Sequence, residues 1–364
     1  MKTILTVVGA RPQFIKAAAV SRALRESARY REIVVHTGQH YDRNMSQTFF
    51  DELDMGLPTH NLEVASGSHG YQTGEMLKRL EPIVKDENPD LVLVYGDTNS
   101  TLAAALTASK LCIPIAHVEA GLRSFNRGMP EEVNRVLTDH VATLLFCPTV
   151  TAVRNLEREG IADNVWNAGD VMYDVALQFA EKSRRKSTAL SELGLRKKEY
   201  ILATIHRAEN TDRRDYLTNI FRALGEISEG IDVVVPLHPR TRKMLVVYGL
   251  IQQSKGIKFI EPVGFLDMIA LESSARLIAT DSGGVQKEAY FHRVPCVTLR
   301  GETEWVETVE AKWNMLANVE SVERICGVLR ESLAFSGQRC EIHDYGDGSA
   351  AYKIVQSLSK FLAA

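Results

Sequence analysis

The feature that most constrains the fold is an alternation, repeated along the whole chain, of short β-branched runs with longer amphipathic stretches. Strands are expected at residues 4–8, 32–37, 91–95, 113–118, 144–147, 200–204, 232–237, 257–260, 275–280 and 296–299. Helical periodicity lies between them, as at residues 14–26, 74–87, 101–110, 131–140 and 216–229. Such alternation is typical of parallel sheets with helices on both faces, so the chain is predicted to be a doubly wound α/β protein.

The length of the chain and one break in this rhythm predict two domains. A chain of 364 residues exceeds one ordinary core. Residues 181–199 are polar and rich in charge, so we place a linker near residues 170–198. Rossmann-like domains are expected over residues 1–172 and 173–349, with a cleft between them. Because α/β sheets bind ligands at the carboxyl ends of their strands, the functional residues should follow strands directly.

The composition argues against several classes of partner. No apolar run approaches the ~20 residues of a membrane span, and the N-terminus lacks a signal-peptide cleavage site. We therefore expect a cytoplasmic protein without a membrane partner. A net charge of −3 gives no electrostatic case for binding nucleic acid. The five cysteines contain no CxxC pair, and Cys112 and Cys296, beside apolar strands, are predicted to be buried reduced thiols.

The turn after the first strand is a candidate anion site. Gly9 permits a tight turn, Pro12 suits the first helical position, and Arg11 stands beside the amide donors of the helix start. The segment is not GxGxxG, so a dinucleotide fingerprint is absent. A plain strand–helix turn with a surface arginine is the alternative for this segment.

A second candidate anion site covers residues 279–288. An apolar strand runs into Ser282, Gly283 and Gly284, and then a helix begins. The two glycines allow backbone amides to approach a phosphate closely, and the helix dipole favours negative charge. Glu288 lies where a carboxylate could accept both hydroxyls of a ribose. A merely structural turn is the alternative, and the lack of a Walker lysine pattern disfavours ATP hydrolysis.

Acid–base candidates follow two strands in the first half of the chain. Asp97 comes after the strand at 91–95, and Glu119 and Arg123 lie in the glycine-containing loop after the strand at 113–118. Glu131 and Arg135 lie on the next helix. Two simpler interpretations stay open: Asp97 as a helix cap, and Glu131 with Arg135 as a surface ion pair at i, i+4 spacing.

Two histidines end successive strands in the second half of the chain. His206 and His238 are both expected to face the predicted cleft, although a lone histidine is more often structural. A metal site at His36, His40 and Asp42 is not predicted, because these residues lie in a strand-to-loop region and no HExxH pattern exists.

Six motifs together carry a resemblance to a known family. GARPQFIK, GDTNST, HVEAGLRS, PEEVNR, TIHRAEN and TDSGGVQKEA occur in the order of the non-hydrolysing UDP-N-acetylglucosamine 2-epimerases, and the late GDGSAA segment is also similar to theirs. The resemblance covers essentially the whole chain. It implies the GT-B architecture, with residues 350–364 packing back on the N-terminal domain, and a homodimer.

The resemblance also implies roles for residues. Those that match the UDP-binding set are Arg11, Ser282, Gly283, Gly284 and Glu288. Those that match the catalytic set are Asp97, Glu119, Glu131 and His206, with Arg135 nearby. Further substrate contacts are expected from Gln13, Lys16, Arg123 and His238.

The chemistry that the resemblance implies is elimination of UDP across C1–C2, followed by re-addition to the glycal with the proton returned to the opposite face of C2. A carboxylate base must lie against the C2 proton, and the leaving diphosphate must be stabilised. Which carboxylate is base and which is acid stays open. No nicotinamide cofactor and no metal is needed.

Departures from the family pattern bear on the substrate. The family usually reads GTRPEAIK, where this chain has Ala10, Gln13 and Phe14. Residues 300–305 are similar to the branch that acts on UDP-2,3-diacetamido-2,3-dideoxyglucuronic acid and makes its manno isomer for surface polysaccharide such as O-antigen. Our hypothesis is that Gln13 removes a negative charge near the site and so favours a substrate with an extra carboxylate.

Other activities remain as alternatives. UDP-N-acetylglucosamine is the alternative substrate, and the loop at residues 39–43 differs from the family loop linked to allosteric UDP-N-acetylglucosamine binding, which puts such regulation in doubt. The GT-B fold also serves UDP-sugar glycosyltransferases, so the fold does not settle the function. A hydrolysing epimerase and a catalytically silent UDP-sugar sensor are the remaining alternatives.

Overall fold

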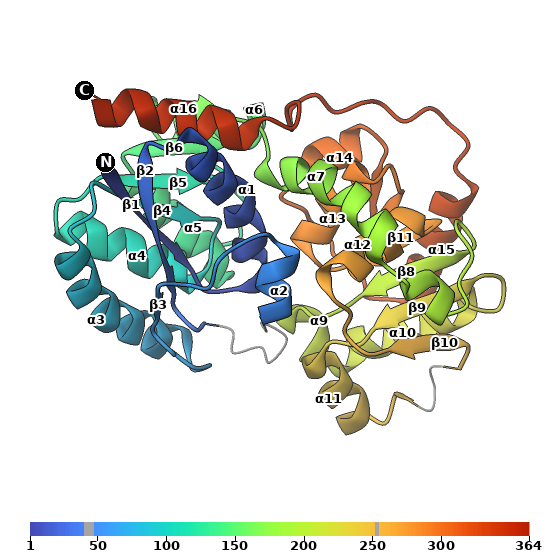
Figure 1. Ribbon diagram of the computed structural model, residues 1–364. Helices are drawn as coiled ribbons and strands as arrows, with labels where there is room; N and C mark the ends of the chain where they lie inside the picture. Colours follow the sequence, from blue (N-terminus) through green and yellow to red (C-terminus); the bar gives the residue numbers. More distant parts are fainter. Residues whose placement is uncertain (40–46, 252–254, 364) are drawn as a thin grey trace. The chain divides into compact units, whose positions relative to one another are not determined.

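The computed structural model describes residues 1–39, 47–251 and 255–363, and the chain packs as two compact units (Figure 1). Unit 1 comprises Met1–Val175 and His343–Ala364, and unit 2 comprises Ala176–Ile342. Much of the segment expected to be a linker is helical, in α7 (Val171–Lys186) and α8 (Ala189–Glu192). No helix in these described ranges is long and apolar enough to cross a membrane.

Unit 1 is built on a seven-stranded parallel sheet in the order β3-β2-β1-β4-β5-β6-β7. The central strands β1 and β4 are continuously apolar over most of their length and buried, as strands covered on both faces must be. The strands are β1 (Lys2–Val8), β2 (Tyr30–His36), β3 (His60–Asn61), β4 (Leu91–Tyr95), β5 (Ile115–Val118), β6 (Leu144–Cys147) and β7 (Val165–Asn167). The remaining helices of unit 1 are α1 (Arg11–Ser27), α2 (Gln47–Glu52), α3 (His69–Glu87), α4 (Asn99–Lys110), α5 (Pro130–Val141), α6 (Val150–Arg158) and α16 (Ala350–Ala363).

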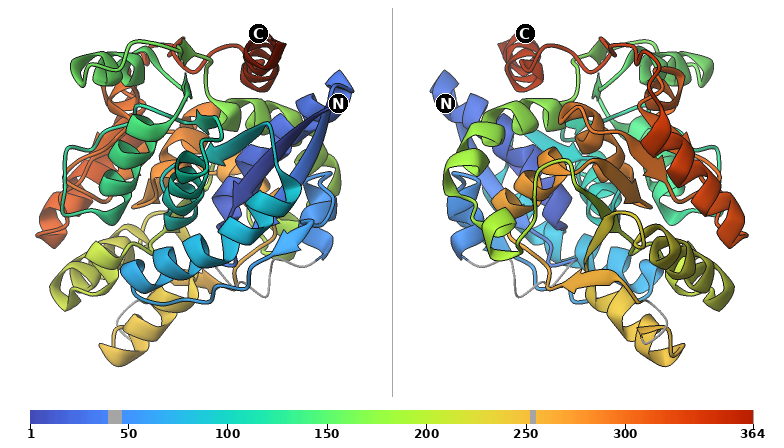
Figure 2. Two further views of the ribbon diagram at one scale, coloured as in Figure 1. Left: turned by 90° about the vertical axis from the view of Figure 1, so that its left-hand side faces the viewer. Right: turned by 90° about the vertical axis from the view of Figure 1, so that its right-hand side faces the viewer.

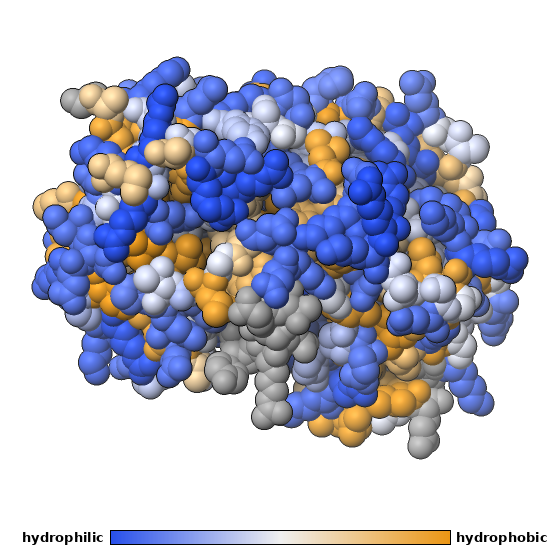
Figure 3. Space-filling view, in the orientation of Figure 1, coloured by the Kyte–Doolittle hydropathy of each residue, from blue (hydrophilic) through white to orange (hydrophobic). Residues whose placement is uncertain are grey.

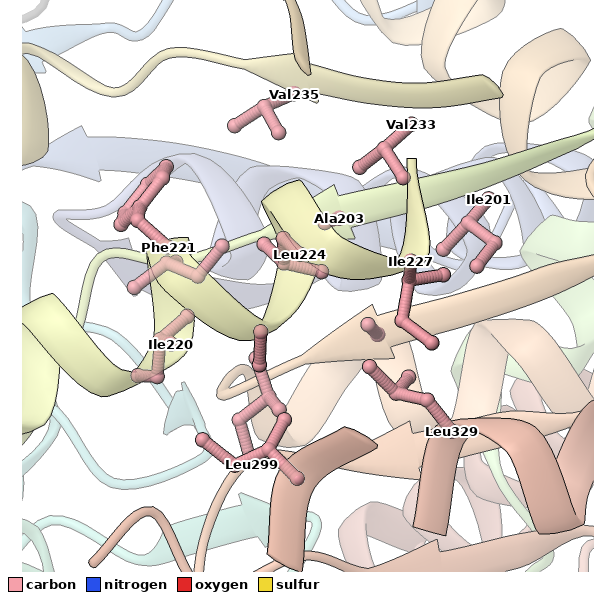
Figure 4. Close-up of a cluster of buried hydrophobic side chains, with 14 of the residues drawn as sticks. Ile201, Ala203, Ile220, Phe221, Leu224, Ile227, Val233, Val235, Leu299 and Leu329 are labelled. Atoms are coloured by element: carbon pink, nitrogen blue, oxygen red, sulfur yellow. The ribbon is translucent and has the colours of Figure 1, made fainter. Parts of the chain in front are cut away.

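Unit 2 repeats this plan with a six-stranded parallel sheet in the order β10-β9-β8-β11-β12-β13. Its strands are β8 (Tyr200–Thr204), β9 (Asp232–Pro236), β10 (Ile257–Ile260), β11 (Leu277–Thr280), β12 (Cys296–Thr298) and β13 (Asn314–Leu316). Its other helices are α9 (Ala208–Thr211), α10 (Arg214–Ile227), α11 (Pro239–Val247), α12 (Phe265–Ser274), α13 (Gly283–Phe291), α14 (Val306–Glu310) and α15 (Val322–Ala334). Side chains of the sheet, such as Ile201 and Val233, meet Phe221 and Leu224 of α10 and Leu329 of α15 in one buried cluster (Figure 4).

The predicted fold class is confirmed, and the strands that sequence analysis missed share one property. β3, β7 and β13 are two or three residues long and each forms an edge of its sheet. Runs this short are too brief to show a hydrophobic period. An edge strand also needs little apolar surface, because it has a strand neighbour on one side only. The sequence therefore predicted the sheet interiors better than their edges.

The cysteine prediction is half right. All five cysteines are free thiols, and Cys296 is buried on β12 as expected. Cys112 is exposed, so its predicted burial is wrong. It lies just past the end of α4 with a left-handed backbone at φ 57°, in the turn that leads to β5, and not on the apolar strand itself.

The last helix, α16, packs beside α1 at the sheet of unit 1 (Figure 1 and Figure 2). Its buried face includes Ile354 and Leu358. At its start, the Asp174 carboxylate of α7 accepts hydrogen bonds from the backbone N–H groups of Ala350, at 3.1 Å, and Ala351, at 2.7 Å. A carboxylate here satisfies two backbone N–H donors that have no partner within the helix, and it complements the helix dipole.

The face drawn in Figure 3 is mostly hydrophilic, with apolar side chains in small separate areas.

The Asp174 cap predicts a pH-dependent stability. Burial raises the pKa of Asp174 to about 6, and the two amide bonds offset this only in part. The folded pKa exceeds the ordinary value near 3.8, so the folded state favours the neutral form of Asp174. The contribution of Asp174 to the free energy of unfolding is therefore fully present below pH 3.8, and it is lost as pH rises through about 6. Relative to wild type, Asp174→Asn should therefore gain about 1–3 kcal/mol of unfolding free energy between pH 4 and pH 7.5.

Urea unfolding at both pH values measures this gain. Asp90→Asn is the control, because hydrogen bonds from Lys2 and Thr3 lower the pKa of half-buried Asp90, so its effect should be almost constant over this range. A constant difference for Asp174→Asn as well would contradict the prediction.

Candidate active site

The carboxyl ends of three adjacent strands in unit 1 bring several predicted residues together. Lys16, on α1 after β1, forms an ion pair with Glu119, which follows β5 directly. Gly96 follows β4, and a methyl group there would lie 3.1 Å from Glu119 Oε2 and 3.4 Å from Lys16 Nζ. The ion pair therefore sits against the bare Cα of Gly96, whose φ of +62° also suits glycine.

Asp97 is held by α5. Arg135 donates from Nη2 to Asp97 Oδ2 at 2.6 Å and from Nη1 to Glu132 Oε2 at 2.8 Å. Asn134 Nδ2 donates to the Asp97 carbonyl oxygen at 2.9 Å. The helix-cap alternative for Asp97 is wrong, because Thr98 is the N-cap of α4. The Asp97 carboxylate is thus paired with a buried arginine on a different element.

Glu131 and Glu132 lie in the first turn of α5, but their surroundings differ. Glu131 is half-buried, whereas Glu132 is buried and accepts backbone N–H bonds from Ser124 and Phe125, both at 2.9 Å. Burial opposes the charge of Glu132, but Ser124 and the guanidinium of Arg135 lower its pKa overall. Sequence analysis did not select Glu132, which fixes the loop after Glu119 to the helix that carries Glu131.

Gln13 is a fully engaged buried side chain. Its Oε1 accepts from Gly9 N at 2.8 Å and Ala10 N at 3.1 Å, and its Nε2 donates to Tyr95 O at 2.8 Å and Thr101 Oγ1 at 2.9 Å. These bonds tie the β1–α1 turn to the end of β4. A glutamate here would set a carboxylate oxygen against the Tyr95 carbonyl, so Gln13→Glu would test folding as much as substrate charge. Arg11, the first residue of α1, is partly exposed in the same turn.

Arg123 is buried in an ionic network of unit 1. Its guanidinium donates to Asp139 Oδ2 at 2.7 Å, to both oxygens of Glu159 and to the carbonyl of Leu122. Burial disfavours its charge, but Glu159 and Asp139 raise the pKa of Arg123 overall. Substrate contact by Arg123 stays a prediction, and the observed partners favour a supporting role. In the sequence, the feature that could have indicated this network is His117, a polar residue within an otherwise apolar strand.

In unit 2, the start of α13 follows β11 at Ser282. A methyl group at Gly283 would lie 3.6 Å from both Arg207 Nη2 and Trp305 Nε1, so the first turn of the helix stands beside a guanidinium. Arg207 Nη2 lies 3.9 Å from Glu304 Oε1, and Gly284 is exposed. An amide-rich helix start beside an arginine can bind a phosphate. Sequence analysis did not select Arg207.

His206 and His238 lie together at the ends of β8 and β9, with ring centroids 5.6 Å apart. The fully buried carboxylate of Asp281 accepts from the backbone N–H groups of His206 and Arg207, each at 3.1 Å. His206 Nδ1 lies 3.8 Å from Asp281 Oδ1, and Asn210 donates to Asp281 at 3.1 Å. Asp281, missed as a functional candidate, therefore holds the turn that carries His206.

Glu288 lies in the second turn of α13 beside the buried Glu272 of α12. Burial, together with the charge of Glu288 and a hydrogen bond to it, raises the pKa of Glu272. His292 Nε2 is 3.7 Å from Glu272 Oε2, and burial lowers the pKa of His292 to about 4. A neutral Glu272 can donate a hydrogen bond to the Glu288 carboxylate.

No set of three His, Cys, Asp or Glu side chains within residues 1–39, 47–251 and 255–363 could hold a metal ion. His40 and Asp42 lie outside these described residues, as does most of the loop at 39–43.

Comparison with known proteins gives matches over almost the whole chain. The sequence model of the UDP-N-acetylglucosamine 2-epimerase family matches residues 22–359. A Methanococcus maripaludis protein named UDP-N-acetylglucosamine 2-epimerase homolog is 55% identical, over 98% of this chain and 99% of its own. The UDP-2,3-diacetamido-2,3-dideoxy-D-glucuronate 2-epimerase of Pseudomonas aeruginosa is 50% identical over 98% of this chain and 99% of its own.

A solved structure matches the fold. The Methanocaldococcus jannaschii UDP-GlcNAc 2-epimerase, crystallised with UDP-GlcNAc and UDP, has a TM-score of 0.92 and 43% identity, covering 99% of this chain and all of its own. The family resemblance found in the motifs is thereby confirmed, as is the predicted GT-B type of α/β fold with two Rossmann-like sheets.

Proposed function

Because this chain belongs to the UDP-N-acetylglucosamine 2-epimerase family and is an isomerase of the UDP-sugar 2-epimerase class, we propose that it inverts C2 of a UDP-sugar by elimination and re-addition of UDP. The observation that supports this proposal is that Lys16, Glu119 and Asp97 lie together at the carboxyl ends of the adjacent strands β1, β4 and β5. Two carboxylates there, each with a cationic partner, fit a reaction that must move a proton on both faces of one carbon.

The proposed steps balance as follows. A carboxylate of unit 1 takes the C2 proton while the C1–O bond breaks and its electrons leave with the diphosphate. The glycal that results has a C1=C2 double bond. UDP then adds back through its oxygen to C1, and a second group delivers a proton to the opposite face of C2. Asp97, Glu119, Glu131 and His206 are the proposed proton carriers.

UDP is proposed to bind at the start of α13. The N–H groups after Ser282, with Arg207 beside Gly283, would hold the diphosphate, and Glu288 would accept the ribose hydroxyls. Arg11, on α1, is proposed as a further diphosphate ligand. Negative charge that develops on the leaving group is thus met by fixed donors, which is where such donors lower a barrier.

The proposed substrate is UDP-2,3-diacetamido-2,3-dideoxy-D-glucuronate, and the proposed product is its manno isomer. Support comes from the Pseudomonas aeruginosa relative at 50% identity and from the sequence of residues 300–305. UDP-N-acetylglucosamine is the second candidate, because the 55% identical relative bears that name. We further propose that the enzyme is a cytoplasmic homodimer that supplies surface polysaccharide synthesis.

Proton NMR in D₂O tests this proposal, with each of the two UDP-sugars in a separate tube. We expect deuterium at C2 and a manno product from the diacetamido-uronate alone. Exchange of UDP-N-acetylglucosamine alone would keep the reaction and overturn the substrate. Exchange of neither sugar would overturn both and favour a UDP-sugar glycosyltransferase, which would leave the C2 proton in place.

A further inference from the structure

A buried histidine connects the two strand ends that carry Asp97 and Glu119. His117, on β5, has its Nδ1 2.7 Å from Asp139 Oδ1 and its Nε2 2.8 Å from the carbonyl oxygen of Gly96. The side chains of His117 and Asp139 are fully buried. None of the reaction steps proposed above uses this pair.

The hydrogen-bond partners decide the protonation of the ring. The Gly96 carbonyl can only accept, so Nε2 of His117 must carry a hydrogen. Oδ2 of Asp139 accepts from Gly121 N at 3.0 Å and from Arg123 Nη1 at 2.7 Å, as expected of a carboxylate. An ionised Asp139 also accepts at Oδ1, so Nδ1 of His117 is a donor as well. Both ring nitrogens then carry hydrogens.

The charges in this cluster balance. His117 and Arg123 are two cations, and Asp139 and Glu159 are two anions, of which only Glu159 is part-exposed. Burial opposes the charge of Asp139, but His117 and Arg123 lower its pKa overall. The Cys147 thiol, whose pKa is raised by burial and by Asp139, faces the same carboxylate from β6. The four charges sum to zero, and their mutual attraction offsets the desolvation cost that a lone buried imidazolium would carry.

We propose that His117, as a hydrogen-bond donor from both ring nitrogens, is a positioning residue that locks the Gly96–Asp97 turn onto β5. Both backbone groups of Gly96 are held by that strand, because its N–H donates to Val118 O at 2.9 Å while its carbonyl accepts from His117. Glu119 follows Val118 directly, so one strand end fixes the carboxylate of Glu119 and the turn that carries Asp97. A charged donor makes the stronger hydrogen bond for this purpose.

The protonation state is tested directly by ¹⁵N NMR of protein labelled in its histidine rings. The His117 signals are those that disappear in His117→Gln. We expect both ring nitrogens to show imidazolium shifts at pH 7. A neutral ring in the wild-type protein at this pH would overturn the proposal, whatever the activity.

The positioning role rests on the proposed function and is tested by kinetics. His117→Gln should lower kcat about 10- to 100-fold while KM changes less than about threefold, because the proposed ligands of UDP lie elsewhere. His343→Gln, the same change at an exposed histidine of unit 1 outside this cluster, should leave both constants unchanged. An unchanged kcat in His117→Gln would overturn the positioning role.

Asp139→Asn separates positioning from simple stability. Without the carboxylate, Nδ1 of His117 loses the anion that holds its hydrogen, so the ring should show the shifts of a neutral imidazole at pH 7 and kcat should fall. Imidazolium shifts in Asp139→Asn at pH 7, or an unchanged kcat, would overturn the proposal. Failure of the proposed function would be visible separately as a wild type that epimerises neither sugar, and the NMR measurement would still decide the state of His117.

Discussion

Glu119→Gln is expected to lower kcat about 10²- to 10⁴-fold, the range that a positioned proton-transfer group contributes. The amide keeps the size of the side chain but cannot take a proton, and it breaks the ion pair with Lys16. Steady-state epimerisation of the sugar identified by NMR measures the loss. Asp97→Asn is expected to fall in the same range, because it removes the carboxylate that Arg135 holds.

The control for Glu119→Gln is a glutamate in a similar pair elsewhere in unit 1. Glu26 is ion-paired with Arg22 on the exposed side of α1, so Glu26→Gln should keep its activity. Deuterium incorporation into unreacted substrate adds a second readout, since a variant that lacks only the manno-face group still exchanges on the gluco face. Full kcat in Glu119→Gln would remove this residue from the catalytic set.

Gly283→Ala is expected to weaken UDP binding about 10- to 100-fold, or about 1.4–2.7 kcal/mol, with no loss of stability. The folded protein should tolerate the methyl group, because the atoms nearest to the added carbon would lie 3.6 Å from it, which is an ordinary van der Waals distance. The backbone at Gly283 is also not left-handed, so alanine can adopt it. The proposed diphosphate, however, must approach the amides of this turn, and the methyl group would stand in its way. Titration calorimetry with UDP and thermal unfolding measure the two effects separately.

Gly327→Ala is the matched control. Gly327 lies on α15 of the same unit with no heavy atom within 4 Å of an added methyl group. We expect unchanged UDP binding and a gain of about 0.5–1 kcal/mol in unfolding free energy, since alanine is the better helix former. Wild-type affinity for UDP in Gly283→Ala would show that the phosphates bind elsewhere.

The sequence by itself determined the fold class, the interiors of both sheets and the family. Continuous apolar runs such as β4 are buried whichever neighbours they have, and strand–helix alternation admits few topologies. The sequence also placed Asp97 and Glu119 just after parallel strands, where the carboxyl ends meet. Local pattern sufficed because each of these features depends on residues close in sequence.

Only the tertiary structure decided which polar residues support the site. Gln13 bonds to Tyr95, 82 positions away, and Asp281 holds the backbone of His206 from 75 positions away. His117, Asp139 and Arg123 show no shared spacing in the chain, yet they form one buried ionic cluster. The sequence shows which groups can ionise or donate a hydrogen bond. Burial and pairing with distant residues decide which of them stay charged, and these arise only when the strands and helices pack.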